Sequence, residues 1–395
     1  MPRRSSSPTL PAPAATPQAP TLPADFGERI VRWQRAHGRH DLPWQNTRDA
    51  YRIWLSEIML QQTQVAAVIG YYQRFVAEFP DVAALAAAPA ERVMALWAGL
   101  GYYSRARNLH RCARIVVEQH GGVFPSDPAL LATLPGIGRS TAAAIAAFSA
   151  GVRAPILDGN VKRVFARCFG IEGYPGEKAV ENRMWDIAAQ VLPAPGPAQA
   201  DDMVAYTQGL MDLGATVCTR GKPACLVDPS RCPLADRCVA LRDGLTARLP
   251  TPRTRAPLPE RSTVMLLIRH GRNVLLRQRP EQGIWGGLWS LPEMPVSGIP
   301  FDDEAAQDDA MANAAAFGVT GHATMLAELT HVFTHFRLHI RVIRVDMAAR
   351  SLQDGEPAVL GGGPWRWISL DALDAVGMPA PVRALLQTQA RPALF

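Results

Sequence analysis

The sequence predicts a multidomain fold in which a mostly α-helical first part precedes a smaller α/β part. Three observations support this prediction. Residues 24–215 repeat apolar side chains at a spacing near 3.6, whereas short β-branched or alternating apolar runs begin after residue 261. Residues 241–260 contain four prolines, which predicts an extended linker between the two parts. The 395 residues suffice for two or three domains.

In the first part, residues 46–79 carry the clearest helical periodicity, and Asn46 is placed to cap its start. Glycines expected just past helix ends, in the left-handed conformation, are Gly101, Gly121, Gly151 and Gly170. Further helices are expected over residues 91–100, 106–119, 140–150, 161–169, 177–192 and 201–213. In the second part, we expect strands over residues 263–268, 274–279 and 339–345, and helices over residues 369–375 and 381–389.

The composition limits the class of protein. Hydrophobic residues make up 48% of the chain and charged residues 19%, as expected of a globular protein. The net charge of +6 favours a polyanionic partner, although many ordinary proteins are as basic. No run of 18 apolar residues is present, so we expect no membrane-spanning segment. Residues 1–23 contain seven prolines and no acidic residue, which predicts a disordered tail and makes a poor signal peptide; a transit peptide is the alternative.

Four of the six cysteines, Cys218, Cys225, Cys232 and Cys238, fall within 21 residues. This crowding indicates a metal site in a reducing compartment, and thus a cytoplasmic protein, rather than a set of disulfides. Four thiolates suit an iron–sulfur cluster or zinc. Cys112 and Cys168 lie on apolar helix faces, where we expect core residues.

The segment 134–142, Leu-Pro-Gly-Ile-Gly-Arg-Ser-Thr-Ala, places Gly136 and Gly138 immediately before a helix. Such a turn, followed by a helix N-terminus, presents backbone N–H groups that can hold a phosphate. The alternative interpretation is an ordinary turn between two helices.

Two carboxylates are candidates for chemistry. Glu57 lies among Leu, Ile and Met on the helix of residues 46–79, where burial raises a carboxyl pKa as a general acid requires; the alternative is an ion pair with an arginine. Asp158 and Asn160 precede the helix at 161–169, where one of them is expected to be the N-cap. On that helix we expect Lys162, Arg163 and Arg167 to point outward.

Residues 24–240 resemble the catalytic domain of MutY-type adenine DNA glycosylases, members of the helix-hairpin-helix glycosylase superfamily. The matching segments are residues 38–39, 42–44, 56–65, 99–103, 134–142 and 157–164. The resemblance implies that Glu57 protonates the flipped adenine and then handles the attacking water. It also implies that Asp158 stabilises, or transiently bonds to, the sugar cation and that Asn160 helps to hold the site.

The same resemblance implies contacts with DNA. Gln62 and Tyr102 would wedge into the duplex, Arg39 and Trp44 would help to line the adenine pocket, and the hairpin would grip the backbone. The residues expected to bind DNA in this part are Arg39, Trp44, Gln61, Gln62, Tyr102, Gly136, Gly138, Ser140 and Lys162. The related endonuclease III carries a lysine at the position of Ser140 that forms a Schiff base and cuts the strand. Ser140 therefore predicts a monofunctional glycosylase.

For the cysteines, the resemblance implies a structural [4Fe–4S] cluster, with zinc as the alternative and no nucleotide cofactor. Family members have gaps of six, two and five residues between the ligands, whereas the gaps here are six, six and five. The four extra residues of the middle gap suit a surface loop containing Pro229.

Residues 261–395 resemble the Nudix-like C-terminal domain of the same family, on the strings 283–289 and 331–336. The Arg-Glu-x-x-Glu-Glu helix of a working Nudix hydrolase is absent, because Asp302, Asp303, Glu304, Asp308 and Asp309 lack its spacing. Family members recognise 8-oxoguanine with a Phe-Ser-His loop. Here Phe333, Thr334 and His335 take those places, and the alternative is that Phe333 and Phe336 are core residues.

The sequence therefore predicts a helical glycosylase domain over residues 24–217, an iron–sulfur loop over 218–240, a linker over 241–260 and a Nudix-like domain over 261–395. The expected function is removal of adenine mispaired with 8-oxoguanine or guanine in double-stranded DNA, by a monomer of bacterial type that associates with the nucleoid. The alternatives are a pyrimidine-lesion glycosylase with lyase activity, a nucleotide pyrophosphatase and a damage-sensing protein without catalysis.

Overall fold

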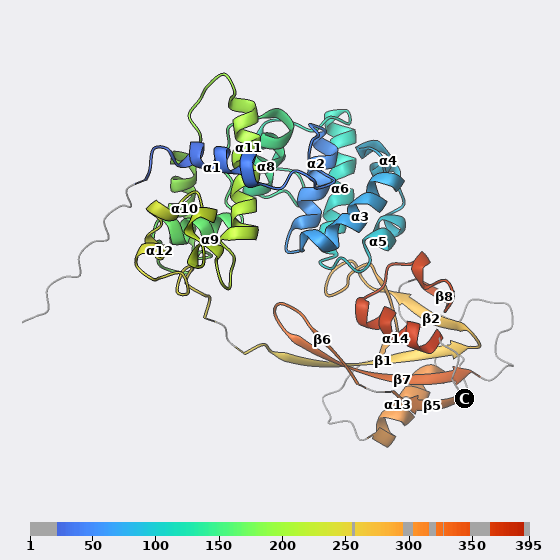
Figure 1. Cartoon of the computed structure of the whole chain (residues 1–395). Helices are drawn as coiled ribbons and strands as arrows, with labels where there is room; N and C mark the ends of the chain where they lie inside the picture. Colours follow the sequence, from blue (N-terminus) through green and yellow to red (C-terminus); the bar gives the residue numbers. More distant parts are fainter. Residues whose placement is uncertain are drawn as a thin grey trace, which may run out of the picture. The chain divides into compact units, whose positions relative to one another are not determined.

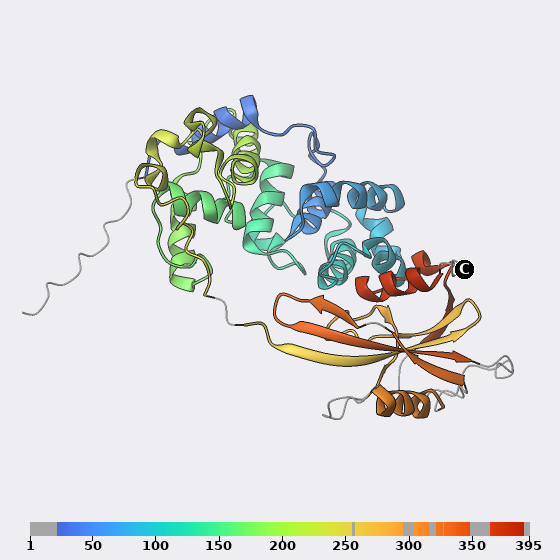
Figure 2. The same cartoon turned by 60° about the horizontal axis from the view of Figure 1, so that its bottom comes forward.

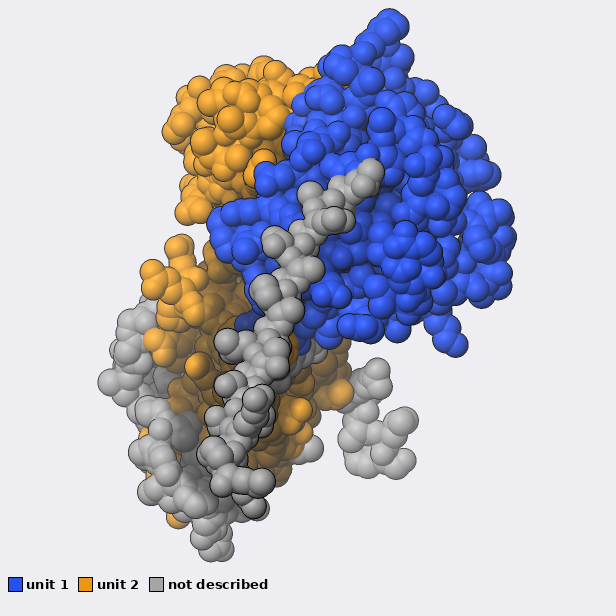
Figure 3. All heavy atoms as spheres, turned by 90° about the vertical axis from the view of Figure 1, so that its left-hand side faces the viewer, with its two compact units in different colours: residues 1–39, 153–253 blue, residues 40–152, 254–395 orange. Residues whose placement is uncertain are grey.

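The computed structural model describes residues 22–254, 257–294, 303–315, 321–326, 328–347 and 364–390. The N-terminal tail and Asp302 therefore lie outside the described residues. The contacts divide the chain into two compact units, coloured separately in Figure 3. Unit 1 comprises residues 1–39 and 153–253, and unit 2 comprises residues 40–152 and 254–395. The chain thus enters unit 1, leaves it for the helices of unit 2, and returns.

Unit 1 is built from four main helices: α1 (Phe26–His37), α9 (Gly159–Cys168), α10 (Lys178–Gln190) and α11 (Gln199–Asp212). Helix α1 packs closely along α11, because a Cβ at Gly209 would lie 2.8 Å from the Ile30 Cγ2 atom. The ring of Phe26 packs against those of Phe165 and Phe169, which ties α1 to the end of α9. Residues more than a hundred positions apart in the sequence therefore form one core.

The remainder of unit 1 consists of short turns that carry the four clustered cysteines. They are η1 (Leu213–Val217), η2 (Ala224–Leu226), η3 (Pro229–Arg231), η4 (Ala235–Arg237) and α12 (Val239–Arg242). Thr246 and Leu249 beyond them are buried. Residues 241–253, the first half of the expected linker, therefore belong to unit 1.

The helical part of unit 2 contains α2 (Ala50–Leu60), α3 (Val65–Glu78), α4 (Val82–Ala87), α5 (Ala90–Trp97), α6 (Ser104–His120), α7 (Pro128–Leu131) and α8 (Arg139–Ala150). The expectation of one helical stretch capped by Asn46 was wrong. Residues 61–64 separate α2 from α3, and Asp49 caps α2 by accepting a hydrogen bond from the Tyr51 backbone N–H. Asn46 instead has a positive φ of 58°. All four glycines expected past helix ends have positive φ, as predicted.

The second part of unit 2 is a mixed sheet with a helix on each face (Figures 1 and 2). Its strands are β1 (Glu260–His270), β2 (Asn273–Gln278), β3 (Trp289–Ser290), β4 (Glu293–Met294), β5 (Gly321–Met325), β6 (Leu329–Val332), β7 (Arg337–Met347) and β8 (Trp365–Ser369). The long central strands β1 and β7 run parallel, and the other pairs are antiparallel. The helix expected over residues 369–375 was wrong, because that segment follows β8 and holds only the short turn η5 (Leu373–Ala375).

Side chains of β1 alternate between the two faces of the sheet, as the pleat requires. Val264, Leu266 and Ile268 share a core with Ala310 of α13 (Asp303–Ala315). Met265 and Leu267 belong to the opposite core, which includes Val382 and Leu386 of α14 (Ala380–Ala390). This second core also contains the buried residues of α2 to α8.

Unit 2 is therefore one continuous body in which the sheet part is fixed to the helices. The Tyr103 hydroxyl donates a hydrogen bond to the Met378 carbonyl oxygen at 3.1 Å. The Trp289 indole N–H donates to Glu91 at 3.1 Å. A Cβ added to Gly377 would lie 3.2 Å from the Met94 backbone, so the two parts approach closely there. Among the described residues, no helix is long and apolar enough to cross a membrane.

Candidate active site

Glu57 lies on α2 in unit 2, one turn before the C-terminal end of the helix. Its neighbours Ser56 and Ile58 are buried, whereas Glu57 itself is half-buried. Because α2 is anchored by a largely apolar buried face, the position of this carboxyl is fixed by the core rather than by a loop. A side chain of this kind can reach a substrate while its backbone stays rigid.

The turn after α2 presents Gln62. Gln62 has a positive φ of 57° and an exposed side chain, so the backbone turns sharply at this residue. The Gln61 side-chain amide donates to the Gly136 carbonyl oxygen at 3.3 Å and lies 3.5 Å from the Thr141 hydroxyl. The end of α2 is thus joined directly to the hairpin segment before α8.

The loop between α5 and α6 presents Tyr102. Positive φ angles occur at Gly99 (97°), Gly101 (79°) and Tyr102 itself (51°). The side chain of Tyr102 is 44% exposed, which is unusual for a large aromatic ring. Gln62 and Tyr102 are the two residues expected to wedge into DNA. Each of them therefore has an exposed side chain and lies where the backbone turns sharply.

The hairpin segment joins α7 to α8. Gly136 has φ of 81°, and Leu134 and Ile137 on either side of it are buried, which anchors the turn. Gly138 is the N-cap of α8 and is exposed, with nothing within 4 Å of an added Cβ. The first backbone N–H groups of α8 therefore lie behind an open glycine, as a phosphate-binding helix start requires.

Asp158 lies in unit 1, at the N-terminus of α9. It is the N-cap, because its side chain accepts a hydrogen bond from the Val161 backbone N–H at 2.8 Å. Desolvation raises the pKa of Asp158, while the N–H groups of Val161 and Asn160 and the charge of Arg163 lower it. The structure thus holds a partly buried carboxyl whose ionised form is stabilised by several N–H groups.

Asn160 is held beside Asp158. Its side-chain amide lies 3.5 Å from the Asp158 Oδ2 atom, and its side-chain oxygen accepts from Arg163 at 2.8 Å. Arg163 also donates to the Gly214 carbonyl oxygen at 2.6 Å, so α9 and η1 fix the amide together. Lys162 forms an ion pair with Glu181 at 2.7 Å.

Two residues expected to line an adenine pocket have strong internal contacts. The Arg39 Nε atom donates to Asp212 at 2.7 Å, and its backbone N–H donates to the same carboxylate at 2.8 Å. Asp212 is almost fully buried. Trp44 is also buried, with its ring edge-to-face on Tyr72 at 5.4 Å. Arg39 belongs to unit 1 and Trp44 to unit 2.

The four clustered cysteines are free thiols on the turns after η1, and Cys225 is buried while the other three are half-buried. The pKa of Cys232 is raised to about 12, mainly by burial and to a smaller extent by Cys225, Cys218 and Cys238. Burial and neighbouring thiol charges likewise raise the pKa of Cys225 and Cys238. The four sulfur atoms therefore interact with one another.

Mutual repulsion of this kind makes four thiolates unfavourable without a cationic centre. The donor set thus fits an iron–sulfur cluster or zinc chemically. No group of three or more His, Cys, Asp or Glu side chains among the described residues is placed to hold a single metal ion. Cys112 and Cys168 are buried, as expected of core residues.

Phe333, Thr334 and His335 form the turn between β6 and β7. The ring of Phe333 stacks on that of Phe336, with centroids 4.6 Å apart, and packs against Trp285 at 5.2 Å. Phe336 is buried, which confirms that it is a core residue, whereas Thr334 and His335 are exposed at the tip. The hairpin thus supports two polar side chains on an aromatic base.

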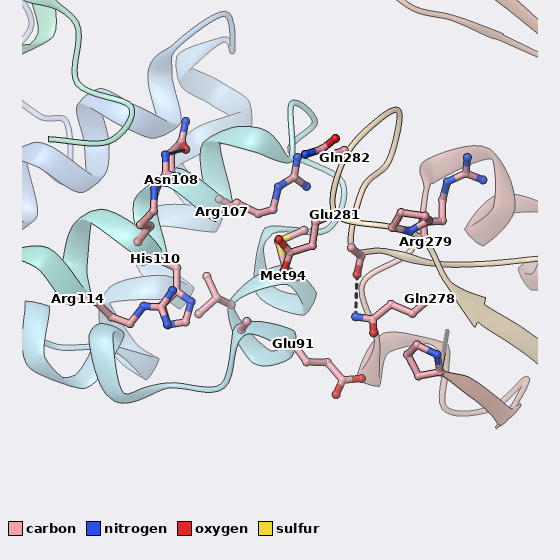
Figure 4. A pocket seen from close by; sticks show the side chains of 17 residues that line it. Glu91, Met94, Arg107, Asn108, His110, Arg114, Gln278, Arg279, Glu281 and Gln282 are labelled. Atoms are coloured by element: carbon pink, nitrogen blue, oxygen red, sulfur yellow. Dashed lines mark hydrogen bonds between the residues drawn. The ribbon is translucent and has the colours of Figure 1, made fainter. Parts of the chain in front are cut away.

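A groove of about 650 Å³ lies between α5, α6 and the β2–β3 loop. Figure 4 shows Arg107, His110 and Arg114 on one side of it and Arg279 and Gln282 on the other. None of the expected catalytic residues lines this groove. The groove is therefore distinct from the expected catalytic residues.

Two residues of the site were missed by sequence reasoning. Arg105 donates hydrogen bonds to both the Gln62 turn and the Tyr102 loop, and Trp285 stacks on Phe333 with a positive φ of 54°. A signal for Trp285 was present in the glycine-rich string 283–289, but Arg105 lies in a helix with no distinguishing motif. Arg167, expected to point outward, is buried and donates to the Leu249 carbonyl oxygen at 2.8 Å.

Comparisons with known proteins identify two domain families in this chain. Residues 55–190 match the model of the HhH-GPD superfamily of base excision DNA repair proteins, and residues 263–388 match that of the NUDIX domain. Adenine DNA glycosylase of Buchnera aphidicola (Acyrthosiphon pisum) is 32% identical, covering 92% of this chain and 97% of the relative. The human adenine DNA glycosylase is 34% identical over 80% of this chain and 66% of its own length.

Among solved structures, a thermostable thymine-DNA glycosylase is 28% identical with a TM-score of 0.46, covering 55% of this chain and 95% of that one. The relatives named adenine DNA glycosylase are thus more than 30% identical to this chain over most of its length. The chain belongs to the adenine DNA glycosylase family.

Proposed function

We propose that this chain hydrolyses the N-glycosidic bond of adenine mispaired with 8-oxoguanine or guanine in double-stranded DNA. The observation that carries the proposal is the pair of carboxyl groups on anchored helix ends. Glu57 is on α2, directly before the turn that presents Gln62, and Asp158 caps α9. Family membership over nearly the full length supports the same conclusion.

Glu57 acts first as a general acid. Adenine leaves poorly until a ring nitrogen is protonated, and Glu57 is a half-buried carboxyl whose position on α2 is fixed by the core, as a proton donor requires. After the bond breaks, the same group, now ionised, accepts a proton from the attacking water. Before the water attacks, the positive charge left on the sugar is stabilised by the carboxylate of Asp158.

Asn160 positions Asp158 rather than reacting itself. Its amide lies between the aspartate and Arg163, so it fixes one oxygen of the carboxylate while Val161 fixes the other. An ionised Asp158 held in this way does not have to reorganise when the sugar cation forms.

The turns around α2, α6 and α8 provide the DNA contacts. The hairpin glycines Gly136 and Gly138 hold the phosphate backbone, and Gln61, Gln62 and Tyr102 engage the duplex beside the mispair. On the other strand, Thr334 and His335 at the β6–β7 tip recognise the oxidised guanine, with Phe333 supporting them. Arg39, Trp44 and Lys162 remain predicted contacts, although each already has an internal partner.

Ser140 lies in the first turn of α8 and cannot form a Schiff base. We therefore propose base removal without strand cleavage. The competing function, a pyrimidine-lesion glycosylase with lyase activity, would need an amine at this place.

The four cysteines of unit 1 hold a metal centre, for which we propose a [4Fe–4S] cluster. Cys218, Cys225, Cys232 and Cys238 are its ligands, and the group would supply structural cross-linking of the turns after η1. The four-cysteine donor set and the resemblance to family members that carry a [4Fe–4S] site support this proposal, and zinc is the alternative.

The first experiment is single-turnover cleavage of a duplex with one adenine opposite 8-oxoguanine, analysed with and without alkali. We expect strand breaks only after alkali treatment. Breaks without alkali would favour the lyase. The proposed function would be refuted if neither this duplex nor one with adenine opposite guanine gave any product. The same protein run on a sizing column should elute as a monomer.

Glu57→Gln tests the assignment of the acid. This variant should bind the mispaired duplex as the native protein does but release no adenine, because Gln cannot donate a proton. Retained turnover would assign the acid to another residue while leaving the activity itself established.

A further inference from the structure

Arg105 is the most extensively hydrogen-bonded side chain around the candidate site. Its NH1 group donates to the carbonyl oxygens of Ile58, Met59 and Gln61 at 3.0, 2.8 and 2.6 Å. Its NH2 group donates to the Thr63 hydroxyl at 3.0 Å and to the Gly101 carbonyl oxygen at 3.2 Å. One guanidinium therefore joins the end of α2 to the loop before α6.

The contacts of Arg105 supply hydrogen-bond donors to carbonyl groups at the C-terminal end of α2. The last carbonyl groups of a helix have no partner within the helix, and Ile58 and Met59 are two residues from the end of α2 or less. An arginine side chain can satisfy such carbonyls from outside.

Arg105 is held between rings as well as carbonyls. Its guanidinium carbon lies 5.3 Å from the Trp97 ring and 5.4 Å from the Tyr102 ring. The side chain is buried, and its Nε atom has no hydrogen-bond partner within the described part of the chain. Burial lowers the pKa of Arg105 to about 10, which still leaves the group charged at neutral pH.

The two segments that Arg105 joins share one property. Gln62 follows directly after the Gln61 carbonyl that Arg105 binds, and Tyr102 follows directly after Gly101. Both residues have positive φ angles, which non-glycine residues adopt only when surrounding contacts hold them there.

We propose that Arg105 is the positioning residue that holds Gln62 and Tyr102 in register with each other, so that both enter the duplex together. This inference rests on the proposed function, in which these two residues wedge beside the mispaired adenine. A lysine would replace Arg105 only in part, because its single nitrogen atom cannot make all the contacts that the guanidinium distributes over two nitrogen atoms.

Arg105→Lys tests the inference with two substrates. On a paired duplex with adenine opposite 8-oxoguanine, we expect adenine release to slow by about 10- to 100-fold, because small displacements of positioning groups have such effects. On DNA in which the target adenine lies in an unpaired loop, we expect the deficit largely to disappear. An unpaired base costs least to flip, so the wedge matters less.

A spectroscopic measurement tests the same step without chemistry. In the Glu57→Gln background, a 2-aminopurine in place of the target adenine should become more fluorescent on binding, as it unstacks. Adding Arg105→Lys should remove most of that increase while the duplex still binds.

Leu109→Ala is the matched control, because Leu109 is buried on the same helix and makes none of these hydrogen bonds. Leu109→Ala should lower the melting temperature and slow adenine release from the paired and the unpaired substrate by the same factor. The inference is overturned if Arg105→Lys slows adenine release from both substrates by the same factor, or slows release from neither. If native protein releases no adenine from either substrate, the proposed function fails instead.

Thr63→Val provides a second variant that keeps the arginine and the side-chain volume. It removes one acceptor of Arg105, so we expect about fivefold slower release from the paired duplex and no change with the unpaired adenine. No change with either substrate would contradict the inference even if Arg105→Lys fails to fold.

Discussion

The two units each contain a buried arginine that donates to backbone carbonyl groups, and the two arginines hold different kinds of segment. Arg105 in unit 2 binds the Gln62 turn and the Tyr102 loop. Arg167 in unit 1 donates to the Thr219 and Leu249 carbonyl oxygens at 2.7 and 2.8 Å, and lies 3.4 Å from the Cys218 sulfur atom.

The turns around Arg105 and those around Arg167 differ in what else stabilises them. The turns around Arg105 also pack on a continuous apolar core, so unit 2 can fix its exposed residues by itself. The turns around Arg167 carry the four cysteines proposed as metal ligands, whose thiolates would repel one another without a cationic centre. Unit 1 is therefore expected to need a metal centre to hold the same kind of irregular chain. Because Arg167 is on α9, whose N-cap is Asp158, this dependence extends to the proposed catalytic carboxylate.

The largest effect should come from Asp158→Asn. Asparagine is also a good N-cap, so α9 should keep its start, whereas the sugar cation loses its anionic partner. We expect adenine release to fall by about a thousandfold in single-turnover assays.

The same variant should not lose stability at neutral pH. Desolvation raises the folded-state pKa of Asp158 above the ordinary value of 3.8, so ionising this group opposes folding. The advantage of the asparagine should therefore be absent below pH 3.8, grow as the pH rises toward the folded-state pKa, and then level off. Asp81→Asn is the matched control for the loss of an N-cap carboxylate, because Asp81 is an exposed N-cap of α4. A melting temperature for Asp158→Asn that falls relative to native protein as pH rises would contradict this explanation.

The second effect tests the metal dependence of unit 1. Cys232→Ser should lose most of the bound iron, lower the melting temperature and slow adenine release by about 10- to 100-fold, because α9 loses its support. Iron is measured colorimetrically per chain. Cys168→Ala is the control, since Cys168 is buried on α9 near the same thiols but is not a proposed ligand. Full iron content in Cys232→Ser, or zinc in place of iron in native protein, would disprove the proposed cluster.

Local sequence signals predicted much of the helical framework and little of what joins it. The helices over α6, α8, α9, α10 and α11 were expected within a few residues, because apolar spacing and C-terminal glycines are local properties. The break after Leu60 was missed. The residues there favour a helix, and the turn at Gln62 depends on Arg105, which lies 44 residues away from Gln61.

The outward orientation expected for Arg167 was wrong for a similar reason. Its position on α9 is exposed only if α9 is considered alone, and the chain that covers it comes from residues 218–249. Residues 369–375 were expected to form a helix, but the preceding residues pair with β2, a contact that no local pattern reports. For the candidate site, the sequence identified the residues but not the contacts between them. Its residues were named from motifs, whereas the contacts that orient them were not.

The tip of the β6–β7 hairpin is a loop held by stacked rings instead of a buried arginine. Thr334→Val removes its hydroxyl group while keeping the shape of the side chain. We expect the preference for adenine opposite 8-oxoguanine over adenine opposite guanine to fall by about fivefold, the equivalent of one hydrogen bond. Thr330→Val on β6 is the control, because Thr330 is exposed three residues before Phe333, where the turn begins, and its loss should leave the preference unchanged. An unchanged ratio for Thr334→Val would remove this hydroxyl from lesion recognition.

The smallest effect concerns Lys162, which shares α9 with Arg167 but points outward. Its ammonium group is paired with Glu181 at 2.7 Å, so its charge is already balanced. A lysine that contacts a phosphate changes the slope of log affinity against log salt by about one. We expect Lys162→Gln to change that slope by much less, and Glu181→Gln to steepen it, because the freed lysine can then reach the DNA. A slope lowered by a full unit in Lys162→Gln would show that the ion pair opens on binding, and that Lys162, unlike Arg167, exchanges its internal partner for DNA.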